Sequence, residues 1–214
     1  MDKKTLMKYI ASFVMGDGGV YRITNGNSYK FVGGHAEKHR DYVDWKCEIL
    51  KELTTVRVSR VLKERRQPYL RIETNTHPIY RKVRNRLYVN GNRRIDPHYL
   101  TLMDWEMMAI LFQDDGNAKD RSLENRKPSI TLPVCMLSFG DSKLFADAVS
   151  DKLGIFFNVV RAGKGYYNLR LRNKDGAVFM QNIKPYLQKS FEYKWISPNA
   201  WLCDKNTDGD TIRT

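Results

Sequence analysis

Residues 9–19 read YIASFVMGDGG, and residues 107–116 read MMAILFQDDG. Each stretch is an apolar run of helical length that ends in an Asp-Gly step, where glycine gives the backbone the freedom to leave the helix. Asp17 and Asp115 therefore end two helices that lie half a chain apart. We expect a duplicated architecture in which these helices pack side by side. Both carboxylates then emerge at one place, which favours a hard divalent cation between them.

The composition favours a polyanionic partner. The chain has 214 residues, of which 42% are apolar, and a formal net charge of +13. This length allows one domain or two closely packed halves. A basic excess spread along the chain is typical of nucleic-acid-binding proteins, although basic proteins without such a partner also exist. An anionic membrane is the weaker alternative, because no apolar run approaches the ~20 residues of a spanning helix.

The cysteines and histidines give little sign of a metal centre or a disulfide. Cys47, Cys135 and Cys203 are odd in number and widely spaced, which predicts reduced thiols in an intracellular protein. No secretory leader precedes the first motif, and the residues fit an organelle, a bacterium or a phage-infected cell equally well. His35 and His39 have i,i+4 spacing, which we interpret as a solvated helix face more readily than as a metal site.

The secondary-structure pattern that follows the first motif recurs after the second. The expected order in each half is helix, two strands, helix, two strands, helix. In the second half we expect a strand over 129–139 that Pro133 interrupts, a helix that Asp141 and Ser142 begin and Gly154 ends, and a last helix over 174–188. The predicted organisation is a unit at 1–90, a linker at 91–101, a unit at 102–203 and a disordered polar tail at 204–214.

Polar side chains alternate along the expected strands. Such alternation usually marks a solvated sheet face, but arginine can also bond purine edges in the major groove with two parallel hydrogen bonds. We therefore predict a DNA-binding surface made of strand residues, together with cationic side chains from two hairpin turns and one from the linker. Its members are Arg57, Arg65, Arg71, Arg93, Lys164, Arg170 and Arg172.

The two motifs resemble those of the LAGLIDADG homing endonucleases, in particular the single-chain branch encoded in introns. Ile10–Gly18 and Met108–Gly116 each align over nine positions with the family motif, whose final acid and glycine coincide with the two Asp-Gly steps. The similarity extends over residues 5–197. It implies an α+β fold of two pseudo-symmetric αββαββα units, with the motif helices at their interface and saddle-shaped antiparallel sheets that lie in the major groove. Small residues, here Ala11 and Ala109, let such helices approach closely.

The resemblance also implies an activity. A family member of this branch is a monomer that cuts both strands of a long asymmetric DNA site with Mg²⁺, for which Mn²⁺ substitutes, leaves 3′ overhangs and promotes intron mobility. Asp17 and Asp115 would bind the metal, with the main-chain carbonyls of Gly16 and Asp114 completing its coordination. The side chain of Asp114 is expected to point elsewhere, since neighbouring helix residues do not share a face.

Family members place a basic residue near each scissile phosphate. The candidates here are Arg94, with Arg93 as the alternative, and Lys194. A cation at these positions stabilises the transition state or tunes the attacking water; the alternative is an ordinary phosphate contact or a solvated charge. Arginine is not a general base, so the first position lacks a lysine-like acid–base role.

Two other interpretations stand beside the nuclease. One is an intron RNA maturase or a non-cleaving DNA-binding protein of the same fold. The retention of both acids favours the enzyme, because carboxylates that face a phosphate backbone repel it unless chemistry requires them. In the other, Asp17 and Asp115 only cap their helices, but a negative charge at a helix C-terminus opposes the macrodipole.

Overall fold

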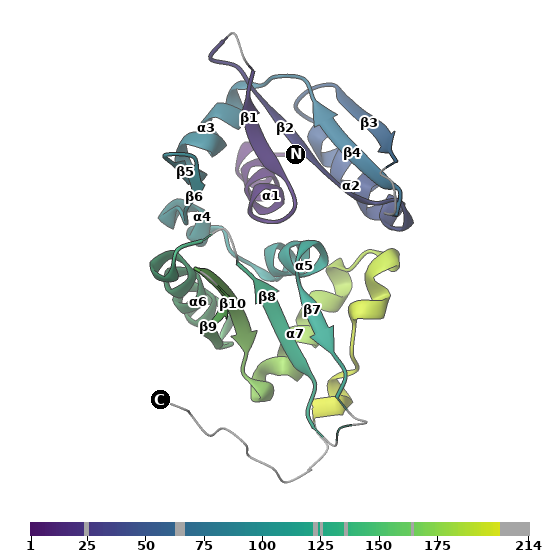
Figure 1. Cartoon of the computed structure of the whole chain (residues 1–214), viewed down its shortest axis with the longest axis vertical. Helices are drawn as coiled ribbons and strands as arrows, with labels where there is room; N and C mark the ends of the chain where they lie inside the picture. The colour runs from purple at the N-terminus through teal and green to yellow at the C-terminus, as the bar shows by residue number, and fades with distance from the viewer. Residues whose placement is uncertain are drawn as a thin grey trace.

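The computed structural model describes residues 1–23, 26–62, 67–121, 124, 126–134, 137–163 and 165–201. Two halves with the same order of elements face each other across a pair of helices (Figure 1). Each half runs helix, strand, strand, helix, strand, strand, helix, which confirms the predicted α+β fold of two αββαββα units. Arg65, Lys164 and the predicted tail at 204–214 lie outside the described residues.

The first half contains α1 (Lys3–Met15), β1 (Gly19–Arg22), β2 (Tyr29–Ala36), α2 (Arg40–Lys51), β3 (Val56–Val61), β4 (Tyr69–Thr74) and α3 (Pro78–Leu87). The second contains α5 (Trp105–Asp114), β7 (Asn117–Lys119), β8 (Ser129–Pro133), α6 (Phe139–Leu153), β9 (Phe157–Gly163), β10 (Tyr166–Leu171) and α7 (Gly176–Ile183). The two antiparallel sheets have the orders β1-β2-β4-β3 and β7-β8-β10-β9. Because these orders are equivalent, each strand of one half has a counterpart in the other.

The segment between the halves is structured. It contains β5 (Tyr88–Val89), β6 (Asn92–Arg93) and α4 (Pro97–Thr101). Asp96 begins α4 by accepting a hydrogen bond from the backbone N–H of His98, and Pro97 occupies the first turn, where a missing N–H costs nothing. The predicted linker at 91–101 therefore includes a short strand and a short helix.

Three elements of the second half have boundaries that differ from prediction. The strand β8 ends at Pro133, and α6 begins at Phe139 because Ser138, and not Asp141 with Ser142, accepts the capping hydrogen bond. Gly154 ends α6 as predicted, in the left-handed conformation with φ of 69°. The last helix is shorter than 174–188, because Pro185 removes a backbone donor and the chain continues there as a 3₁₀ turn.

The helices α1 and α5 form the contact between the halves (Figure 1). Ala11 and Ala109 are both buried, as their small size predicts, and Ile110 is buried with them. Lys8 Nζ, from the middle of α1, binds Asp104 Oδ2 at 2.8 Å and Glu106 Oε2 at 2.6 Å at the N-terminal end of α5. These partly buried ion pairs fix the helices relative to each other at the end opposite the motif acids.

The chain after α7 returns from the second half to the first, where it lies beside α2 (Figure 1, yellow). The Ser190 N–H donates to Asp41 Oδ2 at 2.9 Å. The Phe191 ring stacks on His39 with 4.0 Å between ring centroids and is almost fully buried. This segment therefore adds a second contact between the halves.

Strand register places the predicted arginines on exposed sheet faces. Arg57 pairs with Glu73, and Ser59 with Arg71, on the face opposite the buried Leu70 and Ile72.

In the second sheet Arg170 pairs with Asn158 and Thr131, opposite the buried Leu169 and Leu171. Arg172 is exposed just after β10, and its guanidinium lies 4.7 Å from the centroid of the Phe156 ring. Arg57, Arg71 and Arg170 therefore lie on the sheet faces that the helices leave uncovered, whereas Arg172 lies after the strand, beside residues of α6.

Cys47 is a free, buried thiol, and Cys135 and Cys203 lie outside the described residues. None of the helices in the described part of the chain is long and apolar enough to cross a bilayer.

Gly16 occupies a position that has no room for a side chain. A Cβ at residue 16 would overlap the carboxylate of Asp114 on the facing helix. We expect Gly16→Ala to lower the free energy of unfolding by about 2 kcal/mol, because overpacking forces the two helices apart. Gly140→Ala is the control, since its Cβ would meet Ser138 Oγ at an ordinary 3.9 Å. Equal midpoints in urea for the two variants would contradict the close approach at Gly16.

Candidate active site

The packing of α1 against α5 brings the two motif acids to one place. Asp17 follows α1, Asp115 follows the last residue of α5, and both line a pocket of about 280 Å³. Arg93, Pro133 and Val134 also line this pocket. A larger hollow of about 440 Å³ lies between α6 and β9, and neither acid lines it. The packing of the two helices therefore places both carboxylates in one pocket, as the sequence predicted.

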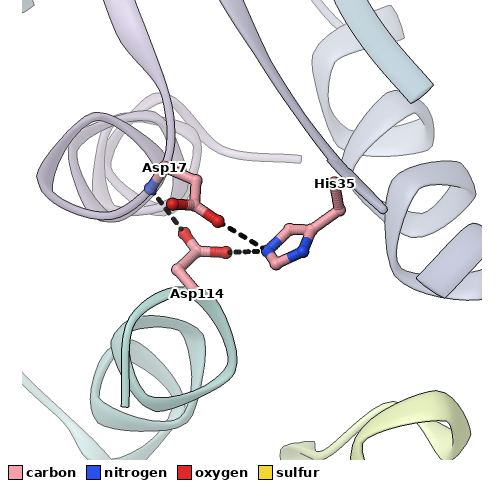
Figure 2. A group of neighbouring side chains, drawn as sticks. All are labelled: Asp17, His35 and Asp114. Atoms are coloured by element: carbon pink, nitrogen blue, oxygen red, sulfur yellow. Dashed lines mark hydrogen bonds and ion pairs between the residues drawn. The ribbon is translucent and has the colours of Figure 1, made fainter. Parts of the chain in front are cut away.

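Asp114 points into the interface, whereas it was expected to point elsewhere. Its Oδ1 accepts a hydrogen bond from Lys46 Nζ at 2.6 Å and lies 3.2 Å from His35 Nε2. Its Oδ2 accepts the backbone N–H of Asp17 at 3.2 Å (Figure 2). The physical reason is Gly16: the missing side chain on α1 leaves the space that the Asp114 carboxylate occupies.

His35 joins the two motif helices. It lies on β2, not on a solvated helix face, and its Nε2 is 2.8 Å from Asp17 Oδ2 as well as 3.2 Å from Asp114 Oδ1 (Figure 2). Its side chain is only 11% exposed. His39 is buried against Phe191, so neither histidine matches the surface pair that their spacing suggested.

The charges in this cluster compensate one another. Burial alone would raise the pKa of Asp114, but the charge of Lys46 and the hydrogen bond from His35 outweigh it and lower this pKa to about 2. Burial likewise lowers the pKa of His35, but hydrogen bonds to Asp114 and Asp17 outweigh it and raise that pKa. Asp114 is thus an ionised, fully buried carboxylate held by a buried ammonium group.

Two groups of side chains in the site have the chemistry of metal ligands. Asp17, His35 and Asp114 place ligand atoms within 4.8 Å of one another. Lys46 already lies on Asp114 Oδ1, however, and its ammonium would repel a cation at that atom.

Asp17 and Asp115 fit a hard divalent cation better. Partial desolvation, followed by the charges of Asp17 and Asp114, raises the pKa of Asp115 to about 7, and Arg93 offsets only part of this. The negative charge of Asp115 is thus only partly neutralised by a protein cation, and Asp17 lies beside it. Two such carboxylates offer the oxygen ligands that Mg²⁺ prefers.

Arg93 and Lys194 make comparable contacts with the two motif helices. Arg93 donates to the main-chain carbonyls of Met15, Gly16 and Gly18 at 3.2, 3.0 and 2.7 Å. Lys194 Nζ donates to the carbonyls of Phe112 and Gln113 at 3.1 and 2.9 Å. Each cation therefore holds the C-terminal end of its own motif helix.

Arg94 lies differently. It donates to the carbonyls of Arg86 and Asn85, at the end of α3. The structure thus brings Arg93 and Lys194 to the acids, and places Arg94 outside that group. Burial lowers the pKa of Lys194, which brings its ammonium closer to giving up a proton.

These features define a protein with two pseudo-symmetric units and a shared acidic site between their motif helices. Residues 8–179 match the LAGLIDADG DNA endonuclease family, and the chain belongs to this family.

Curated proteins with detectable similarity are distant from this chain. The chain is 25% identical to Protein RecA of Mycolicibacterium flavescens over 192 residues, which cover 86% of this chain and 44% of that protein. It is 22% identical to Protein RecA of Mycolicibacterium fallax over 195 residues, with coverages of 87% and 45%. The chain thus spans less than half the length of these relatives.

Three solved structures share the architecture. The homing endonuclease I-WcaI bound to its DNA recognition sequence superposes with a TM-score of 0.77 at 16% identity, over 91% of this chain and 87% of that one. The N-terminal LAGLIDADG domain of DUF199/WhiA gives 0.54 at 12% identity, with coverages of 90% and 88%. The I-SmaMI LAGLIDADG homing endonuclease bound to cleaved DNA gives 0.54 at 10% identity, with coverages of 87% and 85%.

The raised pKa of Asp115 predicts that the free energy of unfolding decreases as the pH rises. A carboxyl with a pKa near 4 in the unfolded chain and about 7 in the folded one loses stabilisation as the pH rises between these values. Asp115→Asn lacks this loss. In EDTA, the difference in unfolding free energy between the variant and the wild type should shift in favour of the variant by on the order of 1 kcal/mol from pH 4 to pH 8. This figure is already reduced for solvent screening.

Urea unfolding at both pH values measures this difference. Asp147→Asn is the control, because its carboxylate lies in an exposed pair with Lys143. A stability difference between Asp115→Asn and the wild type that stays constant with pH would contradict the raised pKa.

Lys46 is expected to be essential for stability. Lys46→Met leaves the buried Asp114 carboxylate without its cation, which typically costs about 3 kcal/mol. Lys46→Met with Asp114→Asn should recover much of this loss, because the uncompensated charge is gone. Lys51→Met is the matched control on the same helix, since Lys51 is exposed and its pair with Glu48 contributes little. Thermal unfolding of the four proteins tests the order of stability.

Proposed function

We propose that the protein is a site-specific DNA endonuclease that hydrolyses both strands of a long asymmetric site with Mg²⁺. On this proposal it acts as a monomer, leaves 3′ overhangs and promotes intron mobility. The observation that carries the proposal is the meeting of Asp17 and Asp115 between two basic sheets, in a chain of the LAGLIDADG DNA endonuclease family. A monomer suffices, because one chain supplies both acids.

The sheet faces supply the DNA contacts in this proposal. Arg57 and Arg71 on one sheet, and Arg170 with Arg172 at the other, offer forked donors to purine edges or phosphates. The net charge of +13 favours association with a polyanion. Similarity to I-WcaI, whose structure contains its recognition sequence, supports the same use of the fold.

The side chains at the acids would divide the chemistry as follows. Asp17 and Asp115 would hold a Mg²⁺ ion, which would supply Lewis-acid polarisation of the phosphate and lower the pKa of a bound water. The main-chain carbonyls of Gly16 and Asp114 would complete its coordination, and that of Gly16 now accepts a hydrogen bond from Arg93. Arg93 provides a permanent positive charge near the first motif. Lys194, with its lowered pKa, can also hold or release a proton near the second.

A second candidate is an RNA maturase or a non-cleaving DNA-binding protein of the same fold. The observation that favours it is the contact of Asp17 Oδ2 with His35 Nε2 at 2.8 Å. An acid committed to an ion pair can serve the protein's own structure without ever binding a metal. Cleavage in the presence of Mg²⁺ distinguishes the two candidates.

Asp17→Asn and Asp115→Asn are expected to bind the target DNA as the wild type does and to lose at least about 100-fold in cleavage rate. Asparagine keeps the shape of each side chain and removes the charge that a metal needs. The measurement is cleavage of a randomised or intron-junction DNA library with Mg²⁺, together with a gel-shift assay in Ca²⁺. Asp44→Asn, an exposed acid on α2, is the control.

Wild-type protein that binds DNA or intron RNA tightly, yet cuts neither at any Mg²⁺ or Mn²⁺ concentration, would favour the maturase or binding-only candidate. Cleavage that survives either asparagine substitution would remove the two acids from the reaction.

A further inference from the structure

The charged cluster of His35, Lys46 and Asp114 joins the two halves, and the described part of the chain has no charged counterpart of it at the pseudo-symmetric position. Strand register makes Val32 of β2 equivalent to Thr131 of β8, since their partners Gly19 and Asn117 both lie two residues beyond a motif acid. Three residues further along each chain, His35 is therefore equivalent to Val134.

The same comparison extends to the second helix of each unit. The shift of 99 residues that relates His35 to Val134 also relates the buried Val43, Lys46, Cys47 and Leu50 of α2 to the buried Ser142, Phe145, Ala146 and Val149 of α6; Tyr42 and Ile49 are buried on α2 in addition. Lys46 is thus equivalent to Phe145, and both are 1% exposed. Asp114 precedes the second acid as Gly16 precedes the first.

All three charged members of the cluster consequently have uncharged counterparts. His35, Lys46 and Asp114 correspond to Val134, Phe145 and Gly16. The two motif acids therefore have different surroundings despite the matching folds. Asp17 is held on two sides, because its carboxylate contacts His35 and its N–H donates to Asp114. At the position equivalent to His35, Val134 presents an apolar side chain to the pocket that Asp115 lines.

We propose that His35, backed by Asp114 and Lys46, is a positioning residue for Asp17 and makes the two cleavage centres unequal, so that one DNA strand is cut before the other. This inference rests on the proposed nuclease function. An acid already fixed in one orientation needs no further ordering to reach the transition state, whereas a less constrained one does. Loss of a residue that orients a metal-binding group typically costs 10- to 100-fold in activity or metal affinity.

The experiment follows each strand of the target separately, with different fluorescent labels, under single-turnover conditions with Mg²⁺. The wild type should nick one strand about 10-fold faster than the other. His35→Val should slow the faster strand by a similar factor and leave the slower strand unchanged. His35→Gln is the rescue variant, because its amide nitrogen can reach the place of Nε2 and donate to Asp17, so it should retain much of the inequality.

The triple variant His35→Val, Lys46→Phe, Asp114→Gly gives each member of the cluster the residue of its counterpart: the first half takes the side chains of Val134 and Phe145, and the second half takes the glycine found at Gly16. Its two strands should be cut at nearly equal rates. Circular dichroism and the unfolding midpoint establish which variants fold, and the single His35→Val variant keeps the test decisive if the triple variant does not. Equal rates in the wild type, or an inequality unchanged by His35→Val, would overturn the proposal.

A measurement without DNA or metal separates this inference from the proposed function. Urea midpoints in EDTA for Asp17→Asn, His35→Val and the double variant form a thermodynamic cycle. Non-additive shifts show that His35 and Asp17 are coupled in the free protein, as the 2.8 Å contact requires. Additive shifts overturn the positioning role. This result stands even if the wild type cuts no DNA, which would contradict the nuclease function alone.

Discussion

The contact between the Asp114 carboxylate and the Lys46 ammonium is the interaction on which the centre of this protein depends. Both side chains are removed from water, at 0% and 2% exposure, so neither charge is tolerable without the other. The pair lies where α1, α2 and α5 meet, and it extends through His35 to Asp17. A single buried ion pair thus links the fold of the first half to the motif of the second.

The space for that carboxylate comes from the opposite motif. Gly16 contributes no side chain, so the last turn of α5 approaches α1 closely enough for Asp114 to accept the N–H of Asp17. The same approach brings Asp17 and Asp115 to one pocket. The arrangement partly buries Asp115 and sets it beside Asp17, and the raised pKa of Asp115 reflects first this desolvation and then the repulsion between the acids. Stability and the proposed chemistry therefore oppose each other at this residue.

Pseudo-symmetry holds for the backbone and for some of the side chains. Arg93 and Lys194 share one equivalent pair of acceptors, the carbonyls of Met15 and Gln113 at the ends of α1 and α5, although they come from different kinds of segment, β6 and the 3₁₀ turn Lys189–Lys194. Because the C-terminal segment returns to α2, Phe191 packs on His39 in the first half. Lys194, three residues later, contacts the second motif helix. The two halves are thus connected both through the motif helices and through this segment.

The sequence by itself determined the elements, their order and the two motif acids. Apolar periodicity, Asp-Gly steps and polar alternation are local properties, so the helices ending near Asp17 and Asp115 and the exposed faces carrying Arg57 and Arg170 could be predicted. Element ends were less certain, because a cap such as Ser138 competes with its neighbours for the same backbone donor.

Only the tertiary structure decided which side chains surround the acids. From the sequence, the Asp114 side chain was expected to point away from the acids and His35 to lie on a solvated helix face. Both predictions were wrong, because spacing along the chain does not tell which residue of another element packs against a side chain. Lys46 gave no signal at all, since a lysine on a helix is usually solvated. The choice between Arg93 and Arg94 likewise depended on the direction of a two-residue strand. These contacts join residues far apart in the chain, and packing alone brings them within hydrogen-bonding distance.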